Sequence, residues 1–206
     1  MKNLKVIAYC SIRNNTIKLN DKTKFAKDPK LSFLEFAKKA YKNYVLDYPK
    51  FFKMDNLSKL AFLASDVLFK SNKIKIDNKE HMAIILSNRS SSLDTDRKHQ
   101  TTIIDQKNYY PIPGLFVYTL PNISIGEISI RHKIKGENAF FVSDKFNAEV
   151  LIQYTISLIK NKKSNFVLCG WVDYDEKKYN AFMYIVSMNG IYKHNKEFLE
   201  KIYNSK

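Results

Sequence analysis

The sequence predicts an α/β fold in which a mixed sheet is covered by helices. Apolar residues alternate on both sides of Asn14 and Asn15, as in a hairpin of two strands. An amphipathic helical pattern over 54–72 precedes a short apolar run over 81–88, which has the length of a strand buried on both faces. The five glycines and five prolines among 206 residues are too few for an all-β barrel.

Length and composition predict one domain over residues 1–206, because 45% of the residues are hydrophobic and can form one sizeable core. The two cysteines, Cys10 and Cys169, are too few for a disulfide framework and fit a reducing compartment. The N-terminus becomes polar too soon for a signal peptide, and no apolar run approaches the about 20 residues of a membrane-spanning helix. We therefore expect a soluble, cytoplasmic protein.

The formal net charge is +15, and lysine supplies most of it, with modest clusters at 22–30 and 160–163. A nucleic-acid binder concentrates Arg and Lys on one face, interleaved with aromatic residues or glycines, and the sequence has no such motif. We therefore expect no nucleic-acid partner. The charge is interpreted either as a lysine-rich, solvated surface or as a field that steers an acidic partner.

The first half of the chain contains a hairpin, two helices and a strand. A polar segment follows the hairpin and ends at Lys30, and apolar residues at helical spacing then predict a helix over 32–45. Asp55 is the expected N-cap of the helix over 54–72. The strand over 81–88 ends in a turn-rich loop over 88–95, at a position where open α/β sheets carry ligand sites.

The loop and the segment after it offer no recognisable catalytic motif. The serines at 90–92 lack a Gly-x-Ser-x-Gly pattern, and they are interpreted as an ordinary loop. A short helix is expected over 94–104. Asp94, Asp96 and His99 have no specific metal-ligand spacing, so we expect no metal.

In the second half, a helix is expected to begin at Pro121 and Asn122. Gly136 is expected to end it, as glycine does after a last helical turn. Gly126 is expected to lie against another backbone, because an unneeded helical glycine costs about 1 kcal/mol. The apolar run over 139–142 is the next strand.

A turn at Ser143 and Asp144 is expected to lead into a helix over 145–159, and its apolar residues occupy more than one face. Such a helix is typical of burial between two layers. Apolar strands are predicted over 166–171 and 181–187, and the tail over 194–205 is predicted to be a surface helix.

The segments PNISIGEISIRHKIKGENAFFV (121–142) and KFNAEVLIQYTISLIKNKKSNFVLCGWVD (145–173) resemble the region around the nucleophilic cysteine of the β-ketoacyl synthases, the condensing enzymes of the thiolase fold. The resemblance covers about 54–173. It implies a thiolase-like N-terminal half only, since these enzymes are about twice as long as this chain. The residue in the place of their cysteine is Lys145.

The resemblance implies no catalytic residue and no cofactor. Lysine cannot accept an acyl thioester as a thiolate does, and His81, His99, His132 and His194 match none of the family's histidine motifs. We expect Lys145 to reach solvent, pair with Asp144 or lie in an interface, and His132 to lie at the surface. The candidates for binding a substrate or partner are Ser143, Asp144, Lys145, Phe146 and Asn122.

By resemblance, the chain is a catalytically inactive subunit that pairs with an active ketosynthase and an acyl carrier protein, as chain length factors do. The pathway would be polyketide or fatty-acid-like, such as the synthesis of a polyene pigment. The expected dimer interface is the strand Ala139, Phe140, Phe141 and Val142, paired across a two-fold axis. One alternative is a stand-alone homodimer that binds acyl chains or carrier proteins, and another is an acyl-thioester hydrolase or transferase that uses Ser143 or Lys145.

Overall fold

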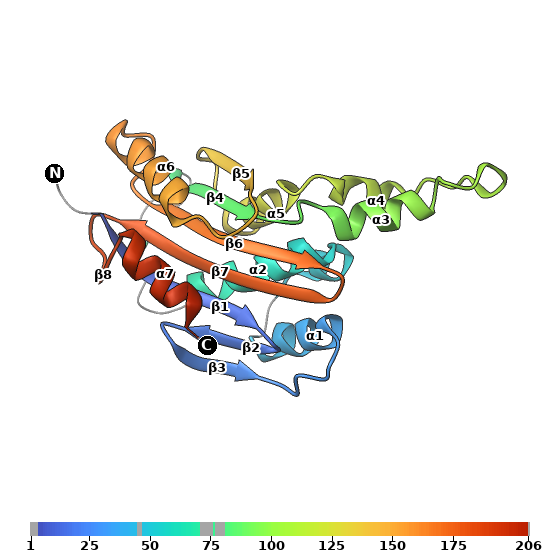
Figure 1. The fold of residues 1–206 in the computed structure, drawn as a ribbon, viewed down its shortest axis with the longest axis horizontal. Helices are drawn as coiled ribbons and strands as arrows, with labels where there is room; N and C mark the ends of the chain where they lie inside the picture. The colour runs from blue at the N-terminus through green and yellow to red at the C-terminus, as the bar shows by residue number, and fades with distance from the viewer. Residues whose placement is uncertain (1–3, 45–46, 71–75, 77–80, 206) are drawn as a thin grey trace.

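The computed structural model describes residues 4–44, 47–70, 76 and 81–205, and in these residues eight strands form one mixed sheet. The sheet order is β3-β2-β1-β7-β6-β4-β5, and β8 pairs with the start of β1 (Figure 1). The strands are β1 (Lys5–Arg13), β2 (Thr16–Leu19), β3 (Lys22–Ala26), β4 (Ala83–Asn88), β5 (Asn138–Val142), β6 (Val167–Asp175), β7 (Lys178–Ser187) and β8 (Tyr192–Lys193).

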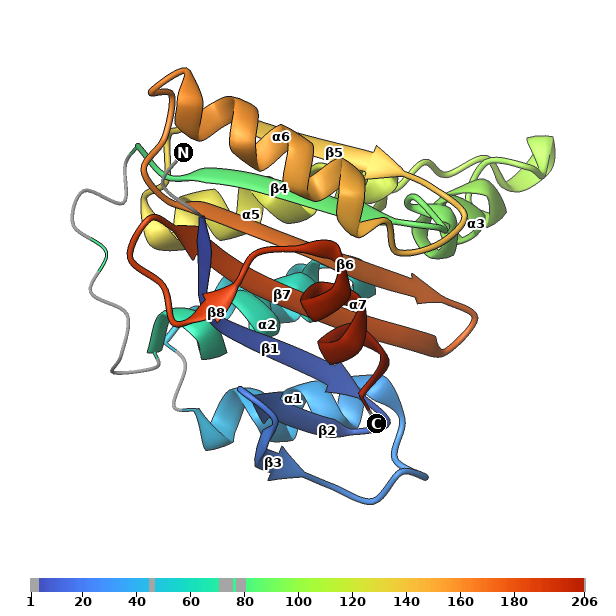
Figure 2. The same ribbon diagram turned by 60° about the vertical axis from the view of Figure 1, so that its left-hand side comes forward.

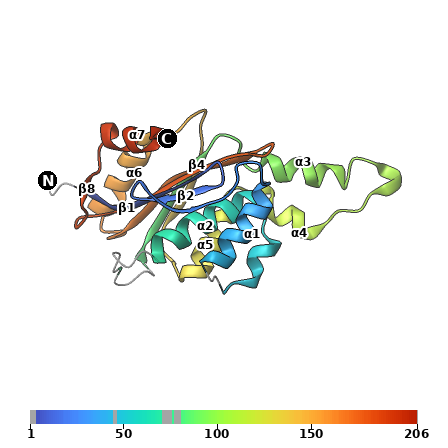
Figure 3. The same cartoon turned by 90° about the horizontal axis from the view of Figure 1, so that it is seen from below.

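Helices cover both faces of this sheet (Figure 3). Helices α1, α2 and α5 lie on one face, and α6 and α7 lie on the other. The helices are α1 (Phe33–Asn43), η1 (Pro49–Lys53), α2 (Asn56–Lys70), α3 (Leu93–Thr101), η3 (Gln106–Asn108), α4 (Pro113–Phe116), η4 (Val117–Thr119), α5 (Ile123–His132), α6 (Ala148–Lys160) and α7 (Lys196–Asn204). No helix in the described ranges is long and apolar enough to cross a bilayer.

The predicted α/β class and mixed sheet are confirmed. Strand β4 lies between β5 and β6 and is parallel to both, whereas β7 is antiparallel to β6 and to β1. The carboxyl ends of β4, β5 and β6 therefore lie at the same edge of the sheet, where ligand sites of open α/β sheets are found.

The N-terminal hairpin lies where the sequence places it. Asn14 and Asn15 have φ of 46° and 56°, and Arg13 pairs with Thr16 across them. Such turns require positive φ, which Asn tolerates. Strand β3 was not expected. Its first three residues are exposed lysines and a threonine, and only Phe25 is buried. Its apolar alternation is too weak to be read from the sequence.

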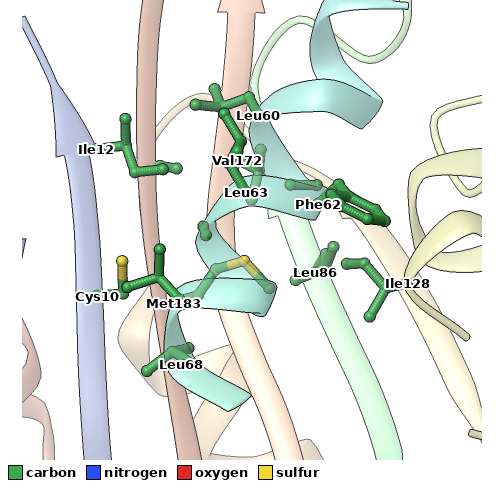
Figure 4. Close-up of a cluster of buried hydrophobic side chains, with 14 of the residues drawn as sticks. Cys10, Ile12, Leu60, Phe62, Leu63, Leu68, Leu86, Ile128, Val172 and Met183 are labelled. Carbon is green, nitrogen blue, oxygen red and sulfur yellow. The ribbon is translucent and has the colours of Figure 1, made fainter. Parts of the chain in front are cut away.

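Helix α2 is the one enclosed on nearly all sides, since every residue from Asn56 to Leu68 is buried. Figure 4 shows Leu60, Leu63 and Leu68 among side chains from the sheet. The prediction that the helix over 145–159 is enclosed between layers is wrong. Helix α6 buries one face on the sheet and leaves Val150 42% exposed on the other.

The start of α2 confirms the predicted cap. The Asp55 carboxylate accepts a hydrogen bond from the backbone N–H of Ser58 at 2.9 Å and another from the Thr95 hydroxyl at 3.0 Å. The first bond satisfies a backbone donor that the helix leaves unpaired, and the second ties α2 to α3. Burial nevertheless raises the pKa of Asp55.

Both glycine predictions for the segment around α5 are wrong. The helix ends at His132 with Lys133 in the left-handed region at φ 57°, three residues before Gly136. Gly136 is instead required by close approach, because a Cβ there would lie 2.8 Å from the carbonyl carbon of Met82. A Cβ on Gly126 would meet no heavy atom within 4 Å.

The prediction that His132 lies at the surface is also wrong. Its side chain is 10% exposed, and its Nε2 lies 3.1 Å from an oxygen of the buried Asp66. Arg131 donates to the same oxygen at 3.3 Å. Burial alone would raise the pKa of Asp66, but the hydrogen bonds and charges of His132 and Arg131 outweigh it and hold that pKa below its usual value. These contacts fasten α5 to α2.

Candidate functional site

The candidate site is the turn of residues 143–147, which joins β5 to α6. The Ser143 N–H donates to the Asn88 carbonyl at 2.9 Å, so the pairing of β5 with β4 continues into the turn. The Ser143 hydroxyl donates to the Lys145 carbonyl at 3.0 Å. The Asn147 side chain accepts from the Val150 N–H at 3.3 Å and is the N-cap of α6. The helix thus begins at Ala148, three residues later than predicted.

Lys145 is exposed and lies two residues before the N-cap Asn147. It is therefore outside α6 and not at its first turn, where the helix dipole and burial would oppose a positive charge. Asp144 is exposed beside it. Of the three environments expected for Lys145, exposure to solvent is the one found in the single chain.

Phe146 is the only buried side chain of the turn. Its ring stacks on Tyr203 with centroids 4.3 Å apart and meets Phe182 edge-on at 5.5 Å and Trp171 edge-on at 6.5 Å. These rings come from α7, β7 and β6, so Phe146 anchors the turn to three other elements. Its side chain is part of the core and not of the exposed surface.

Helix α7 reaches this turn because its inner side is fixed to the sheet. The Tyr203 hydroxyl accepts from the Asn180 amide at 3.0 Å, and the Arg13 guanidinium lies 4.8 Å over the Tyr203 ring. Arg13 also donates to the Asn180 side chain at 2.7 Å. The sequence predicted the helix but not its contact with the turn. The only signal for that contact was the spacing of Leu199, Ile202 and Tyr203, which indicates a buried face.

The loop after β4 lies beside the turn, because Ser143 bonds to Asn88. The Asn88 side chain donates to the Ser91 carbonyl at 2.8 Å and accepts from the Ser91 N–H at 2.9 Å. An oxygen of Asp173, near the end of β6, accepts from the Ser90 N–H at 2.9 Å. The loop over 88–95, at the predicted position of a ligand site, is thus adjacent to the turn. Its polar groups form hydrogen bonds that stabilise the loop conformation.

Asn122 lies apart from the other candidates. It is exposed and directly precedes α5. Helix α5 lies on the face of the sheet opposite to α6 (Figure 3). Its carbonyl accepts from the N–H groups of Ile125 and Gly126 at 3.0 and 3.1 Å. The structure therefore gathers Ser143, Asp144 and Lys145 in one exposed turn and leaves Asn122 outside it.

The expected interface residues Ala139–Val142 lie on β5, which is an edge strand of the sheet. Phe140 packs on the α2 and α5 side, and Phe141 packs on the α6 side with its ring 5.6 Å from that of Tyr154. Val142 is 57% exposed. The strand is therefore half buried within the chain and open along one edge.

Neither cysteine is placed to act as a nucleophile. Cys10 lies on β1 and Cys169 on β6, and both are fully buried. Burial raises the pKa of both thiols, that of Cys169 to about 12. The Cys169 sulfur also lies 3.2 Å from the Thr155 hydroxyl. A thiol so far from ionisation at neutral pH is a poor nucleophile.

The acidic residues of α3 are occupied by other partners. Asp94 accepts from the Asn56 amide at 3.0 Å and from the Lys98 ammonium at 2.6 Å. Asp96 accepts from the Ser92 hydroxyl at 3.1 Å, and the His99 ring lies 5.4 Å from that of Phe116. In the part of the chain that the structure describes, no three His, Cys, Asp or Glu side chains are grouped as metal ligands.

The fold is that of the thiolase-like ketosynthases and chain length factors. The ishigamide ketosynthase/chain length factor superposes with a TM-score of 0.64 at 15% identity, over 90% of this chain and 62% of that one. A ketosynthase in complex with its chain length factor from Xenorhabdus doucetiae gives 0.56 at 13% identity, over 91% of this chain and 80% of the matched chain. A type II acyl-carrier protein in complex with its hexaketide-bound ketosynthase gives 0.59 at 14% identity, over 98% of this chain and 65% of the matched chain.

The chain thus spans less than two thirds of the length of two of these structures. No protein-family model and no curated protein matches the sequence.

Proposed function

We propose that the chain is a catalytically inactive ketosynthase-like subunit that associates with an active ketosynthase. The observation that carries the proposal is the combination of this fold with an exposed Lys145 in the turn after β5, where the resemblance places the nucleophilic cysteine. The chain's two cysteines are buried elsewhere in the sheet. The chain thus has the ketosynthase fold, but its residue at the aligned position, Lys145, cannot supply the thiolate that accepts the acyl group in these enzymes.

The whole chain is proposed to correspond to a single ketosynthase N-terminal domain. In the Xenorhabdus doucetiae complex of a ketosynthase with its chain length factor, the likeness covers 80% of the matched chain. A subunit of nearly this size therefore occurs in such a complex. We propose that the chain has a chain-length-factor-like or stabilising role in such a complex. The pathway would be polyketide or fatty-acid-type synthesis, such as that of polyene pigments, in the cytoplasm.

The edge of β5 supports strand pairing with the partner. The Glu137 carbonyl accepts from the Ile84 N–H at 3.0 Å, and the Ser143 N–H donates to Asn88 at 2.9 Å. Because parallel pairing alternates along a strand, the N–H and C=O groups of Asn138, Phe140 and Val142 point away from β4. No described strand pairs with this side of β5, so these groups form a row of donors and acceptors that another strand can satisfy.

The other edge of the sheet is protected and β5 is not. Edge strand β3 carries exposed Lys22 and Lys24, and charges on an edge discourage further pairing. Strand β5 has the sequence NAFFV and contains no charge. The open edge of β5 is thus the edge at which a second subunit is expected.

A second surface supports association with a large partner. Residues 89–122 form an arm that projects beyond the sheet beside β4 and α5 (Figure 1). The arm exposes large apolar side chains, which include Ile104 (68%), Tyr109 (62%), Tyr110 (75%), Phe116 (63%) and Leu120 (58%). Such a concentration of exposed apolar side chains is typical of a protein interface.

An acyl carrier protein is the second proposed partner. One similar structure contains an acyl-carrier protein with its ketosynthase. Carrier proteins of this kind are acidic by the family resemblance, and a net charge of +15 would attract an acidic partner at long range. The charge would speed the encounter, and contacts at the exposed turn of 143–147 would add specificity.

The association is tested by co-expressing the tagged chain with each intact ketosynthase of its source genome and measuring the mass of the purified species by light scattering. We expect a stable heteromer with one of them. Val142→Pro should abolish it, because proline removes an outward-pointing N–H from the edge, whereas Val142→Thr keeps that N–H and should preserve the complex. A folded monomer that binds no ketosynthase and no carrier protein would refute the proposal, and a tight homodimer in its place would favour the stand-alone module.

Inactivity is tested separately by acyl-thioester turnover with purified chain. The Ser143 hydroxyl donates to a backbone carbonyl, and among the described residues no histidine or carboxylate is hydrogen-bonded to it. We therefore expect no turnover above that of Lys145→Ala. Turnover that Lys145→Ala or Ser143→Ala removes would establish the hydrolase or transferase alternative.

A further inference from the structure

Residues at the C-terminal end of α6, on β8 and at the start of β1 line a cleft of about 860 Å³. Figure 2 shows where these three elements lie in the fold. The volume of the cleft is in the range of small-molecule sites, which is about 300–1,000 Å³. The cleft is distinct from the turn of 143–147, because that turn precedes the other end of α6. Ala148 and Ile159 are separated by roughly 16 Å along the helix axis.

The apolar part of the cleft wall is aliphatic. It consists of Leu4, Ile156, Ile159, Met188 and Ile191. Ile191 is 67% exposed and Met188 47% exposed, so these side chains are accessible at the surface of the cleft. Among the described residues that line it there is no phenylalanine, tyrosine or tryptophan, so these residues offer none of the rings on which nucleobases stack. Such a wall fits a flexible hydrocarbon chain.

The charged part of the wall has one sign. Lys5, Lys160 and Lys193 line the cleft, and its other lining residues in the described part of the chain include no aspartate or glutamate. Lys5 and Lys193 are paired opposite each other on β1 and β8, so two of the ammonium groups extend from adjacent strands. None of the three lysines forms an ion pair with the described residues. Their charge is therefore available to an anion.

His194 adds unused hydrogen-bonding capacity at the same place. It lines the cleft, and both of its ring nitrogens are buried without a hydrogen-bond partner among the described residues. Burial lowers the pKa of His194 to about 4, so its ring is uncharged at neutral pH and the lysines alone supply the positive charge. Unpaired buried polar atoms are destabilising, and the one N–H of the uncharged ring is the atom from which a carboxylate would accept a hydrogen bond.

We propose that this cleft binds a single-chain amphipathic anion, an alkyl chain that ends in a carboxylate. The chain lies along the aliphatic wall of α6 and the segment between β7 and β8, and the carboxylate is held by the lysines of β1, β8 and α6. Compact lysine ammonium groups suit a carboxylate as point charges. The proposal stands independently of the proposed association with a ketosynthase.

Calorimetric titration of the full chain with dodecanoate, below the concentration at which it forms micelles, tests the proposal. We expect saturable binding of dodecanoate. Dodecyltrimethylammonium has the same chain with the opposite charge, and butanoate has the same head with a short chain. Each should bind about tenfold more weakly or not at all, a loss of ~1.4 kcal/mol per factor of ten. Equal binding of either control ligand would overturn the proposal.

Two variants separate the charged wall from the apolar wall. Lys193→Glu and Ile191→Asp change exposed side chains, so both should fold, and each should weaken dodecanoate binding about tenfold or more. The matched controls are Lys22→Glu on β3 and Ile104→Asp on the arm. Lys22 is exposed like Lys193, and Ile104 is 68% exposed against 67% for Ile191, so both controls should leave the affinity within about twofold. Equal effects of the cleft variants and their controls would show non-specific adsorption. Binding only to anionic phospholipid vesicles, with none to monomeric dodecanoate, would also overturn the proposal.

Discussion

The ring of Phe146 stacks on that of Tyr203, with centroids 4.3 Å apart and planes inclined by 20°. This contact joins the turn after β5 to the last helix of the described chain, across 57 positions of sequence. It covers the sheet side of the turn with aromatic rings from α7 and β7. Helix α7 thus occupies part of the face on which α6 lies.

Removal of this contact should weaken both elements. Phe146→Ala should lower the free energy of unfolding by about 3–5 kcal/mol, as for a buried aromatic side chain. Tyr203→Ala should also destabilise the fold, and the double variant should show a coupling of about 0.5–1.5 kcal/mol beyond additivity. Urea unfolding of the four proteins gives these values.

The matched control is Phe116→Ala on the arm. Phe116 is 63% exposed, and its removal should change the unfolding free energy by no more than about 0.5 kcal/mol. Equal losses for Phe146→Ala and Phe116→Ala would contradict the role of Phe146 as an anchor.

The two glycines around α5 should respond oppositely to alanine. Gly126 lies within the helix and a Cβ there meets nothing, so Gly126→Ala should stabilise the fold by about 0.5–1 kcal/mol. Gly136→Ala should destabilise it, because the new Cβ overlaps the backbone of Met82. Thermal unfolding of both variants decides this, and a stabilised Gly136→Ala would show that the backbone near Met82 yields.

These glycines also show what the sequence could predict. A glycine within a helix usually indicates close packing against another backbone, and a glycine after a helix usually indicates the helix end. Neither interpretation applies here. The helix ends on Lys133 in the left-handed region, and the need for Gly136 comes from the approach of Met82, a residue 54 positions away. Periodicity predicts which residues form a helix, but close approach between distant segments depends on packing that the local pattern does not contain.

The same limit separates α2 from α6. The pattern over 54–72 indicates an amphipathic helix, whereas the apolar residues over 145–159 occupy more than one face, so the sequence alone favoured α6 as the enclosed helix. In the structure α2 is enclosed because the sheet, α1 and α5 all pack against it. Its polar residues have partners, as Asp66 has in Arg131. For α6 no layer of the described chain lies outside Val150. The turn itself was placed correctly, because short polar residues between two apolar runs mark a turn locally.

The exposed side chains of the arm should govern self-association without affecting stability. Tyr110→Ser should leave the unfolding free energy within about 0.5 kcal/mol of the wild-type value, because Tyr110 is 75% exposed. It should reduce concentration-dependent light scattering, since an exposed apolar patch promotes association. Leu34→Ser on α1, also exposed at 54%, is the matched control and should leave the scattering unchanged.

His194 should make the fold sensitive to acid. Burial lowers its pKa in the folded chain to about 4 from a usual value of 6.5. Between these two pH values the unfolded chain takes up a proton that the folded chain does not, so the free energy of unfolding falls as the pH drops. The contribution is fully present above about pH 6.5 and reaches a loss of up to about 3 kcal/mol near pH 4.

The measurement is the difference in unfolding free energy between wild type and His194→Gln from pH 7 to pH 4. Carboxylates titrate in the same range in both proteins, and the difference removes their common contribution. The wild-type curve should fall more steeply, by up to about 3 kcal/mol over the range. If His194→Gln runs parallel to wild type, the buried ring is not held uncharged in the folded chain, because a neutral ring at pH 5 requires the steeper curve.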